Sequence, residues 1–278
     1  MLFLLSFIPD PTNISLHQIS NMEGNITVAR SWNELNNWQL SEIAHLYLNT
    51  TPENFSEAYK VMIMILFQKT PEKEDQKFLK KLKRNVPISE LEKHAKFLKD
   101  TTNLTRFPEI PGLIKPADGL GDITARHFST IDTYFFHWNN DRNDLNLKRL
   151  AASLYRIKPQ FDDLDIMKVD AITRKMSIKE LESIALAYMF NRIYIEELYP
   201  IVFPPPQEET EEEKFKPVFK KKPVFTPFDK AIIAMSMDEL QPLGKKQDVN
   251  NVRIYEFFSV MSESIIYHRN KANAYGTK

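Results

Sequence analysis

Four aspartates stand close together in the segment FDDLDIMKVD and are the first candidates for chemistry in this chain. Paired carboxylates can exchange protons with a substrate or bind a divalent cation. Nothing else in the sequence supplies the rest of such a site, and acids in the first turn of a helix are favourable to its dipole. We therefore interpret the cluster as the start of a helix. Its members are Asp162, Asp163, Asp165 and Asp170.

A second constellation, His127, Asp132 and His137, lies on one predicted helix with successive spacings of five residues. Metal ligands on a helix need spacings of three or four, because five residues turn the side chain by about 140°. The glycine-containing stretch Asp118–Asp122 lacks the lysine and hydroxyl of a phosphate-binding loop, so we predict a plain turn there. We expect no enzyme activity, no metal and no cofactor.

The overall charge argues against a protein that coats nucleic acid. Lys plus Arg (37) equals Asp plus Glu (37), whereas affinity for phosphate backbones usually shows as a basic excess. The strongest local exception is the basic cluster Lys77–Arg84, which supports nucleic-acid association as the alternative function. Phe78 is the only aromatic residue in it, so a solvated helix face is the favoured interpretation. With no cysteine, the chain has neither disulfides nor thiolate sites.

The first eleven residues, MLFLLSFIPDP, resemble the core of a signal peptide but lack its basic start and its small-residue cleavage site. The apolar run is too short to cross a bilayer, and no other stretch reaches that length. We expect residues 1–30 to form an arm, with a short strand at Asn25–Ala29. An open alternative is that translation naturally starts at Met22.

Apolar spacings of three and four dominate the rest of the chain and predict a mainly α, multi-helix bundle, with two helical lobes as one arrangement. Helix starts are indicated by Ser31 with Glu34, by Thr51-Pro52, and by Ser177 with Glu180. The predicted parts are the lobe 31–100, a connecting loop 101–121, the lobe 122–200, a Pro-rich charged linker 201–228 and C-terminal helices 229–278.

The linker and the last helix are the features that we single out for function. The motif Lys-Pro-Val-Phe occurs twice in the linker, and an apolar stripe follows on the last helix. Such a helix can dock on a partner or fold back on its own core. We predict that a chain cut before Phe203 keeps a folded, soluble core but loses partner capture. The predicted partner-binding residues are Val218, Phe219, Val224, Phe225, Ile254, Phe257, Phe258, Met261 and Ile265.

Three stretches occur in an order that resembles helical proteins encoded in the tail-gene regions of phages and prophages, particularly those of Bacteroidetes hosts. The resemblance covers about residues 22–200 and leaves the arm and the linker outside. The stretches are Ser31–Leu35, Gly121–Thr124 with Phe128 and Asp132, and Leu147–Arg156 followed by Phe161 and Asp162.

The resemblance implies a tail-assembly chaperone or a minor virion component, located in the bacterial host cytoplasm during assembly or in the virion. It implies binding to other phage proteins and no chemistry. We also expect self-association as a second mode of binding, no small-molecule substrate and no membrane, and the neutral charge disfavours nucleic acid. No catalytic residue is implied. The matching positions read as fold-defining, and they are Trp32, Leu154, Tyr155, Arg156 and Asp162.

Overall fold

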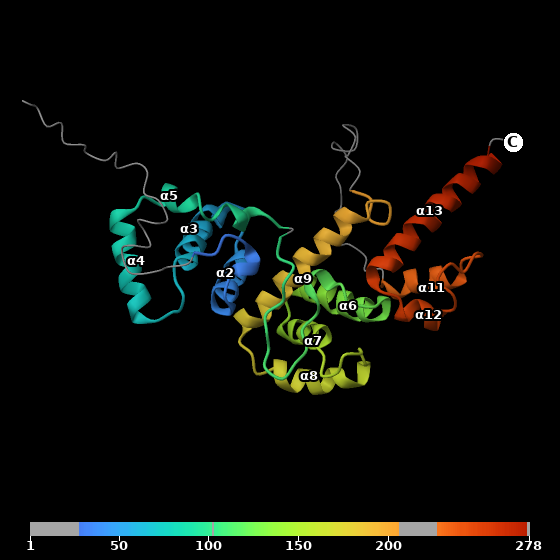
Figure 1. The fold of residues 1–278 in the computed structure, drawn as a ribbon, viewed down its shortest axis with the longest axis horizontal. Helices are drawn as coiled ribbons and strands as arrows, with labels where there is room; N and C mark the ends of the chain where they lie inside the picture. The colour runs from blue at the N-terminus through green and yellow to red at the C-terminus, as the bar shows by residue number, and fades with distance from the viewer. Residues whose placement is uncertain (1–27, 102, 206–226, 277–278) are drawn as a thin grey trace, which may run out of the picture. The chain divides into compact units, whose positions relative to one another are not determined.

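The computed structural model describes residues 28–101, 103–205 and 227–276 (Figure 1). These residues form eleven α-helices joined by loops and short 3-10 turns, with two isolated β-bridges and no strand. The predicted mainly α, multi-helix fold is confirmed. The helices are α2 (Asn37–Asn49), α3 (Phe55–Leu66), α4 (Lys73–Asn85), α5 (Ile88–Glu92), α6 (Ala125–Asp141), α7 (Asp144–Leu154), α8 (Ile166–Thr173), α9 (Ile178–Leu198), α11 (Asp229–Met237), α12 (Lys246–Asn251) and α13 (Ile254–Gly276).

The chain folds as two compact units, and the boundary between them along the sequence lies between Asn103 and Leu104. The first unit contains α2 to α5 and the second contains α6 to α13. The second predicted lobe and the C-terminal helices therefore share one unit, and most of the predicted connecting loop belongs to that unit as well.

The start of the first unit differs from the prediction. Ser31 makes no capping hydrogen bond, and Trp32–Glu34 is a single 3-10 turn. The capping box is formed instead by Asn36 and Gln39, and it opens α2. Both pairs have the same three-residue spacing, so the apolar pattern after them could not decide between them.

Two side chains tie the first unit together through backbone carbonyls. The buried indole of Trp32 donates from Nε1 to the carbonyl of Asp100 at 2.8 Å. The Gln39 amide donates to the carbonyl of Gln68 at 2.6 Å and to that of Leu66 at 3.1 Å, so it occupies acceptors that the end of α3 leaves free.

The helix α9 is buried along its apolar stretch in the second unit. Ser177 and Glu180 form the expected capping box at its start. The residues from Ile184 to Tyr188, with Phe190, are fully buried. A helix that is apolar on every face must be covered on every face, and here it packs among helices of its own unit, α7 among them.

The predicted connecting loop is an integral part of the second unit. Leu104 and Phe107 are buried, and the side-chain amide of Asn191 on α9 donates to the Leu104 carbonyl at 3.0 Å. Farther along, the backbone amides of Ile114 and Arg156 each donate to the other's carbonyl, at 2.7 and 3.0 Å. Buried apolar contacts and these bonds hold the loop in place, although it contains no α-helix.

The predicted turn at Asp118–Asp122 is confirmed as a 3-10 turn over Asp118–Leu120. Gly119 has φ +70°, a conformation that residues with a Cβ rarely adopt. Its carbonyl accepts a hydrogen bond from the Tyr255 hydroxyl at 2.5 Å, so the turn binds the start of α13.

Several predictions fall on residues that are not described. Of the predicted arm, only residues 28–30 are described, and Val28 and Ala29 are not in a strand. The linker is described only at 201–205 and 227–228. The predicted binding residues outside the described part of the chain are Val218, Phe219, Val224 and Phe225.

Candidate partner-binding surface

The last helix, α13, has two halves with different surroundings (Figure 1). In the first half, the ring of Phe258 lies 5.1 Å from that of Phe203, 5.4 Å from Tyr199 and 5.7 Å from Phe128. The ring of Phe228, just before α11, packs edge-on against the same ring with centroids 5.5 Å apart. These aromatic contacts fix the beginning of α13 in the core of the second unit.

This arrangement corrects part of the predicted partner-binding stripe. Ile254, Phe257 and Phe258 are fully buried at 0% exposure, so they pack on the chain's own core and present no surface to a partner. The alternative of folding back therefore holds for these three. Burying each such side chain stabilises the fold by about 1.5–3 kcal/mol. Met261 and Ile265 are only half-buried.

The second half of α13 is held by the loop that follows α11. The Asp238 carboxylate accepts hydrogen bonds from the Ser264 hydroxyl at 2.6 Å and from Nε2 of His268 at 3.0 Å. Its other oxygen accepts from the backbone amide of Leu240 at 2.9 Å. These donors, Ser264 first, lower the pKa of Asp238 to about 2. A Lys271–Glu239 ion pair adds a second link.

The same contact brings exposed apolar side chains beside the helix. Met237 and Leu240 flank Asp238 and are 77% and 56% exposed, and Tyr267 on α13 is 42% exposed. We call these three residues and the half-buried Met261 and Ile265 the α13 surface. Exposed apolar side chains commonly mark sites of protein–protein contact where they lie together.

Sequence reasoning missed Met237, Leu240 and Tyr267. It extended the helix from Asp229 to Leu240, whereas α11 ends at Met237. The chain then turns, and Gln241 has a positive φ of 42°. The run Gln241-Pro242-Leu243-Gly244 was the available signal, because proline and glycine end helices.

The carboxylates of the four clustered aspartates, Asp162, Asp163, Asp165 and Asp170, do not point toward a common site. Asp162 caps the 3-10 turn Asp163–Asp165 by accepting from the Leu164 amide at 3.0 Å. Asp165 lies 2.8 Å from each of the ammonium groups of Lys158 and Lys168, and these hold its pKa below the ordinary value. Asp163 pairs with Arg126, and Asp170 pairs with Arg174.

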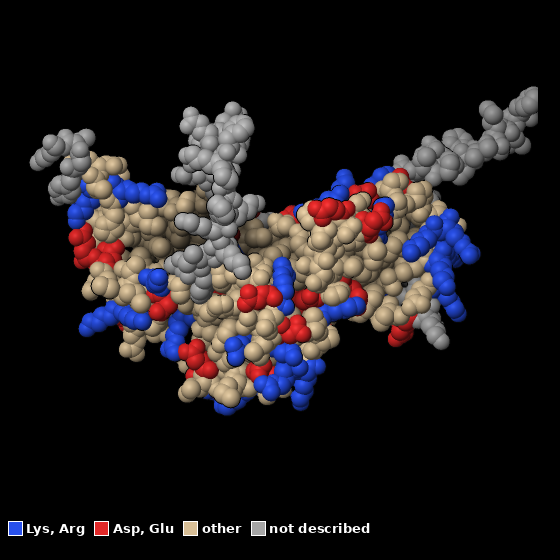
Figure 2. All heavy atoms as spheres, turned by 180° about the vertical axis from the view of Figure 1, so that it is seen from behind, with Lys and Arg blue, Asp and Glu red and all other residues tan. Residues whose placement is uncertain are grey.

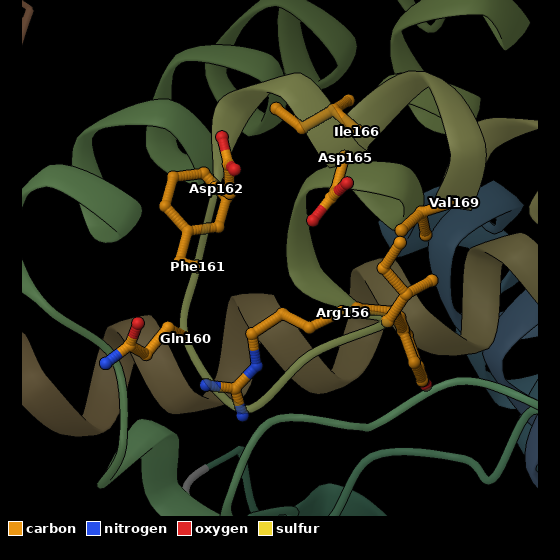
Figure 3. Close-up of a pocket in the computed structure, with 9 residues that line it drawn as sticks. Arg156, Gln160, Phe161, Asp162, Asp165, Ile166 and Val169 are labelled. Atoms are coloured by element: carbon orange, nitrogen blue, oxygen red, sulfur yellow. The ribbon is translucent and has the colours of Figure 1, made fainter.

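A cavity does adjoin this segment, between Arg156, Phe161, Asp165 and Val169 (Figure 3). In Figure 3 the Asp162 and Asp165 carboxylates point in different directions. The cavity has a volume of about 10 Å³, which is the room that a single water molecule needs. It is too small for a substrate, so the helix-start interpretation of the acids is the better account.

The histidine constellation is also dispersed. His127 is buried, its ring stacks on Phe161 at 3.8 Å, and its Nε2 lies 2.6 Å from the Ser153 carbonyl. Burial lowers its pKa to about 4. Asp132 instead receives hydrogen bonds from Arg192 Nε at 2.7 Å and from the Tyr188 hydroxyl at 3.2 Å. In the described part of the chain, no three His, Cys, Asp or Glu side chains gather as metal ligands.

The residues on which the phage resemblance rests make contacts that stabilise the fold. Leu154 and Tyr155 are buried, and the Tyr155 hydroxyl donates to the Pro108 carbonyl at 2.6 Å. Arg156 pairs with Asp122 and donates from Nη1 to the Pro159 carbonyl at 2.9 Å. With buried Trp32 and the cap Asp162, these positions hold loops onto helices, and none lines a site of useful size.

The basic cluster Lys77–Arg84 lies on α4, and its four lysines and one arginine are exposed. Lys and Arg side chains gather at that end of the first unit (Figure 2). Phe78 and Leu82 of the same helix are buried in the first unit. The face therefore offers cationic groups to phosphates but no aromatic ring to bases.

Comparisons with models of protein families, with curated proteins and with solved structures found no match to this chain. Among the described residues, no helix has the length and apolar character needed to cross a membrane.

Proposed function

We propose that this chain is a non-enzymatic protein of a phage or prophage that binds other virion proteins. It acts as a tail-assembly chaperone or as a minor structural component of the virion, in the host cytoplasm during assembly or in the finished particle. The motif order from Ser31 to Asp162 supports the phage assignment. The α13 surface supports the binding role.

The observation that carries the binding role is the exposure of Met237, Leu240 and Tyr267 beside a helix that is anchored at only one end by aromatic packing. Met237 and Leu240 are 77% and 56% exposed, and apolar side chains that lie together on a surface commonly mark sites of protein–protein contact. The ammonium group of Lys271 lies 5.9 Å from the centroid of the Tyr267 ring and pairs with Glu239, so charges of both signs lie beside this surface and can select among partners.

The first test is the gene neighbourhood, where we expect a tail-tube or tape-measure gene; the second is co-expression of the full chain with the proteins that such genes encode, followed by affinity capture. The triple variant Met237→Ser/Leu240→Ser/Tyr267→Ser should lose at least about tenfold in captured partner, because a few large side chains carry most of the binding energy of an interface. All three side chains are exposed, so the variant should melt near the wild-type temperature.

The matched control is Leu164→Ser/Met167→Ser at the start of α8, where the side chains are 81% and 82% exposed. This variant removes as much exposed apolar surface from a different place and should capture partner normally. An equal loss of captured partner in both variants would show that the capture was caused by non-specific hydrophobic binding. Location of the gene in a metabolic operon would contradict the phage assignment itself.

A further inference from the structure

A hollow of about 220 Å³ opens in the first unit, and the functions considered above do not use it. It lies between the extended residues before the Trp32–Glu34 turn and the corner that joins α5 to the 3-10 turn Lys96–Lys99. Its volume suits a small ligand or a single functional group of a larger one. The lining residues are Val28, Ala29, Arg30, Lys93, His94, Lys96 and Phe97.

Positive charge is concentrated around this hollow. Arg30, Lys93 and Lys96 are all exposed at it. Lys93 is paired with Glu90 at 2.7 Å. Within the described residues, no carboxylate pairs with the guanidinium of Arg30 or with the ammonium of Lys96, which leaves two cationic groups without a counter-charge.

The nearby acids are already engaged. The Glu34 carboxylate accepts from the backbone amide of Arg30 at 2.8 Å, and Glu92 lies 3.1 Å from the Lys99 ammonium. The residues that line the hollow include Arg30, Lys93 and Lys96 and no acid, so its walls carry positive charge although the whole chain is neutral. Burial and the neighbouring Lys93 also lower the pKa of His94.

One wall of the hollow is apolar. Val28 and Ala29 are buried, and the ring of Phe97 is fixed edge-on against Trp32 with centroids 6.1 Å apart. Phe97 is itself half-buried and lines the hollow. A fixed ring beside two unpaired cations can contact the apolar part of a ligand whose charged end meets Arg30 and Lys96.

We propose that this hollow binds an oxyanion, the phosphate or carboxylate group of a small ligand, between Arg30 and Lys96, with the ligand's apolar portion against Phe97. Guanidinium and ammonium groups form charge-assisted hydrogen bonds with either anion. The bound charge also offsets the mutual repulsion of the cations.

The test is calorimetric titration of the full chain with inorganic phosphate, phenyl phosphate and benzoate, with ionic strength held constant by sodium chloride. Phenyl phosphate should bind more tightly than inorganic phosphate, because only the former reaches Phe97. Comparison of phenyl phosphate with benzoate then assigns the site to phosphate or to carboxylate. In parallel, the ring signals of His94 are followed by NMR, and its pKa should rise on binding because a nearby anion favours the protonated ring.

The variant Arg30→Met/Lys96→Met should bind phenyl phosphate about tenfold more weakly or worse and should abolish the His94 response. Both side chains are exposed, so the fold should survive, and a thermal melt checks this. The control, Lys80→Met/Lys83→Met, removes two exposed ammonium groups from α4 and should bind as the wild type does. Absence of binding by all three anions, or equal weakening in both variants, would overturn the proposal.

Discussion

The Asp238 carboxylate lies 3.0 Å from Nε2 of His268, a residue 30 positions farther along the chain. With the 2.6 Å hydrogen bond from Ser264, this contact fastens the loop after α11 onto the part of α13 that lies beyond the aromatic core. The α13 surface exists because this loop is in place, so its stability depends on the charge of one carboxylate.

Strong acid should release this loop from α13. The pKa of Asp238 is lowered to about 2, so its stabilising contribution is fully present above its unfolded value near 4 and is lost as pH falls from about 4 to about 2. After allowance for solvent screening, the contribution is about 1–2 kcal/mol. Amide hydrogen exchange across residues 259–271 should speed up in this window.

The variant Asp238→Ala should show the same fast exchange at pH 7. Glu263→Gln, which removes an exposed carboxylate from the same helix, serves as its control and should behave as the wild type. Unchanged protection of α13 in Asp238→Ala would mean that aromatic packing alone orders the whole helix.

Phe258→Ala should destabilise the second unit by about 3–5 kcal/mol, because it removes a fully buried ring from a cluster of aromatic side chains. Chemical denaturation followed by amide signals of α6 and α13 measures the loss. The first unit, α2 to α5, should keep its own transition. Tyr267→Ser, an exposed position on the same helix, should change the free energy of unfolding by less than about 0.5 kcal/mol.

Truncation separates anchoring from binding. A chain cut before Phe203 loses the buried side chains of Ile232, Val249, Phe257 and Phe258, so we expect its second unit to be destabilised, in contrast to the sequence-based prediction of a folded core. A chain that ends at Val260 keeps these residues and should stay folded while losing partner capture. Circular dichroism and affinity capture give the two readouts, and retained capture by this shorter chain would place the binding site elsewhere.

The contrast within α13 shows how far sequence alone reaches. The spacing of Ile254, Phe258, Met261 and Ile265 correctly predicted an amphipathic helix. The periodicity of apolar residues shows which face of a helix is buried, but not where along the helix the burial ends. The end of burial depends on which segments, distant in the sequence, pack against that face. The rings of Tyr199 and Phe203 cover only the beginning of this stripe.

The first unit gives a second example. The spacing of Ser31 and Glu34 and that of Asn36 and Gln39 are equally good capping signals. Gln39 takes the role because its amide also reaches the Gln68 carbonyl at 2.6 Å, a contact made only when α3 packs beside α2. Local pattern therefore fixed the existence of the helix, and tertiary contact fixed its first residue.

Mild acid should weaken the second unit through His127. Its pKa is lowered to about 4, so the unfolded chain takes up a proton between about pH 6.5 and pH 4 while the folded chain does not. Stability is therefore lost as pH falls through this range, by roughly 2–3 kcal/mol at pH 4. Chemical denaturation at half-unit pH steps measures the slope.

The variant His127→Phe keeps a ring against Phe161 and removes the titrating group. It should be less stable than the wild type at pH 7, because the Ser153 carbonyl loses its partner, but its stability should not fall further between pH 6.5 and pH 4. A wild-type slope that persists in this variant would assign the effect to another group.

Nucleic-acid association through α4 is the competing function, and it makes a different prediction. If Lys77, Lys80 and Lys83 contact phosphates, duplex or single-stranded DNA should shift in a gel, and binding should weaken steeply between 50 and 200 mM salt. We expect no shift at 150 mM salt, given the neutral chain and the buried Phe78. A salt-sensitive shift that is lost in Lys77→Gln/Lys80→Gln/Lys83→Gln would favour the competing function.

The bond from Tyr255 to the Gly119 carbonyl joins residues 136 positions apart, and the amide of Ile254 donates to the Ile123 carbonyl at 2.9 Å. During synthesis on the ribosome, everything from Leu104 onward must wait for the last helix before it can close, whereas the unit from α2 to α5 needs nothing beyond residue 103. During most of translation, the apolar side chains of the incomplete second unit are therefore exposed to solvent. A host chaperone that binds these side chains should raise the yield of folded protein.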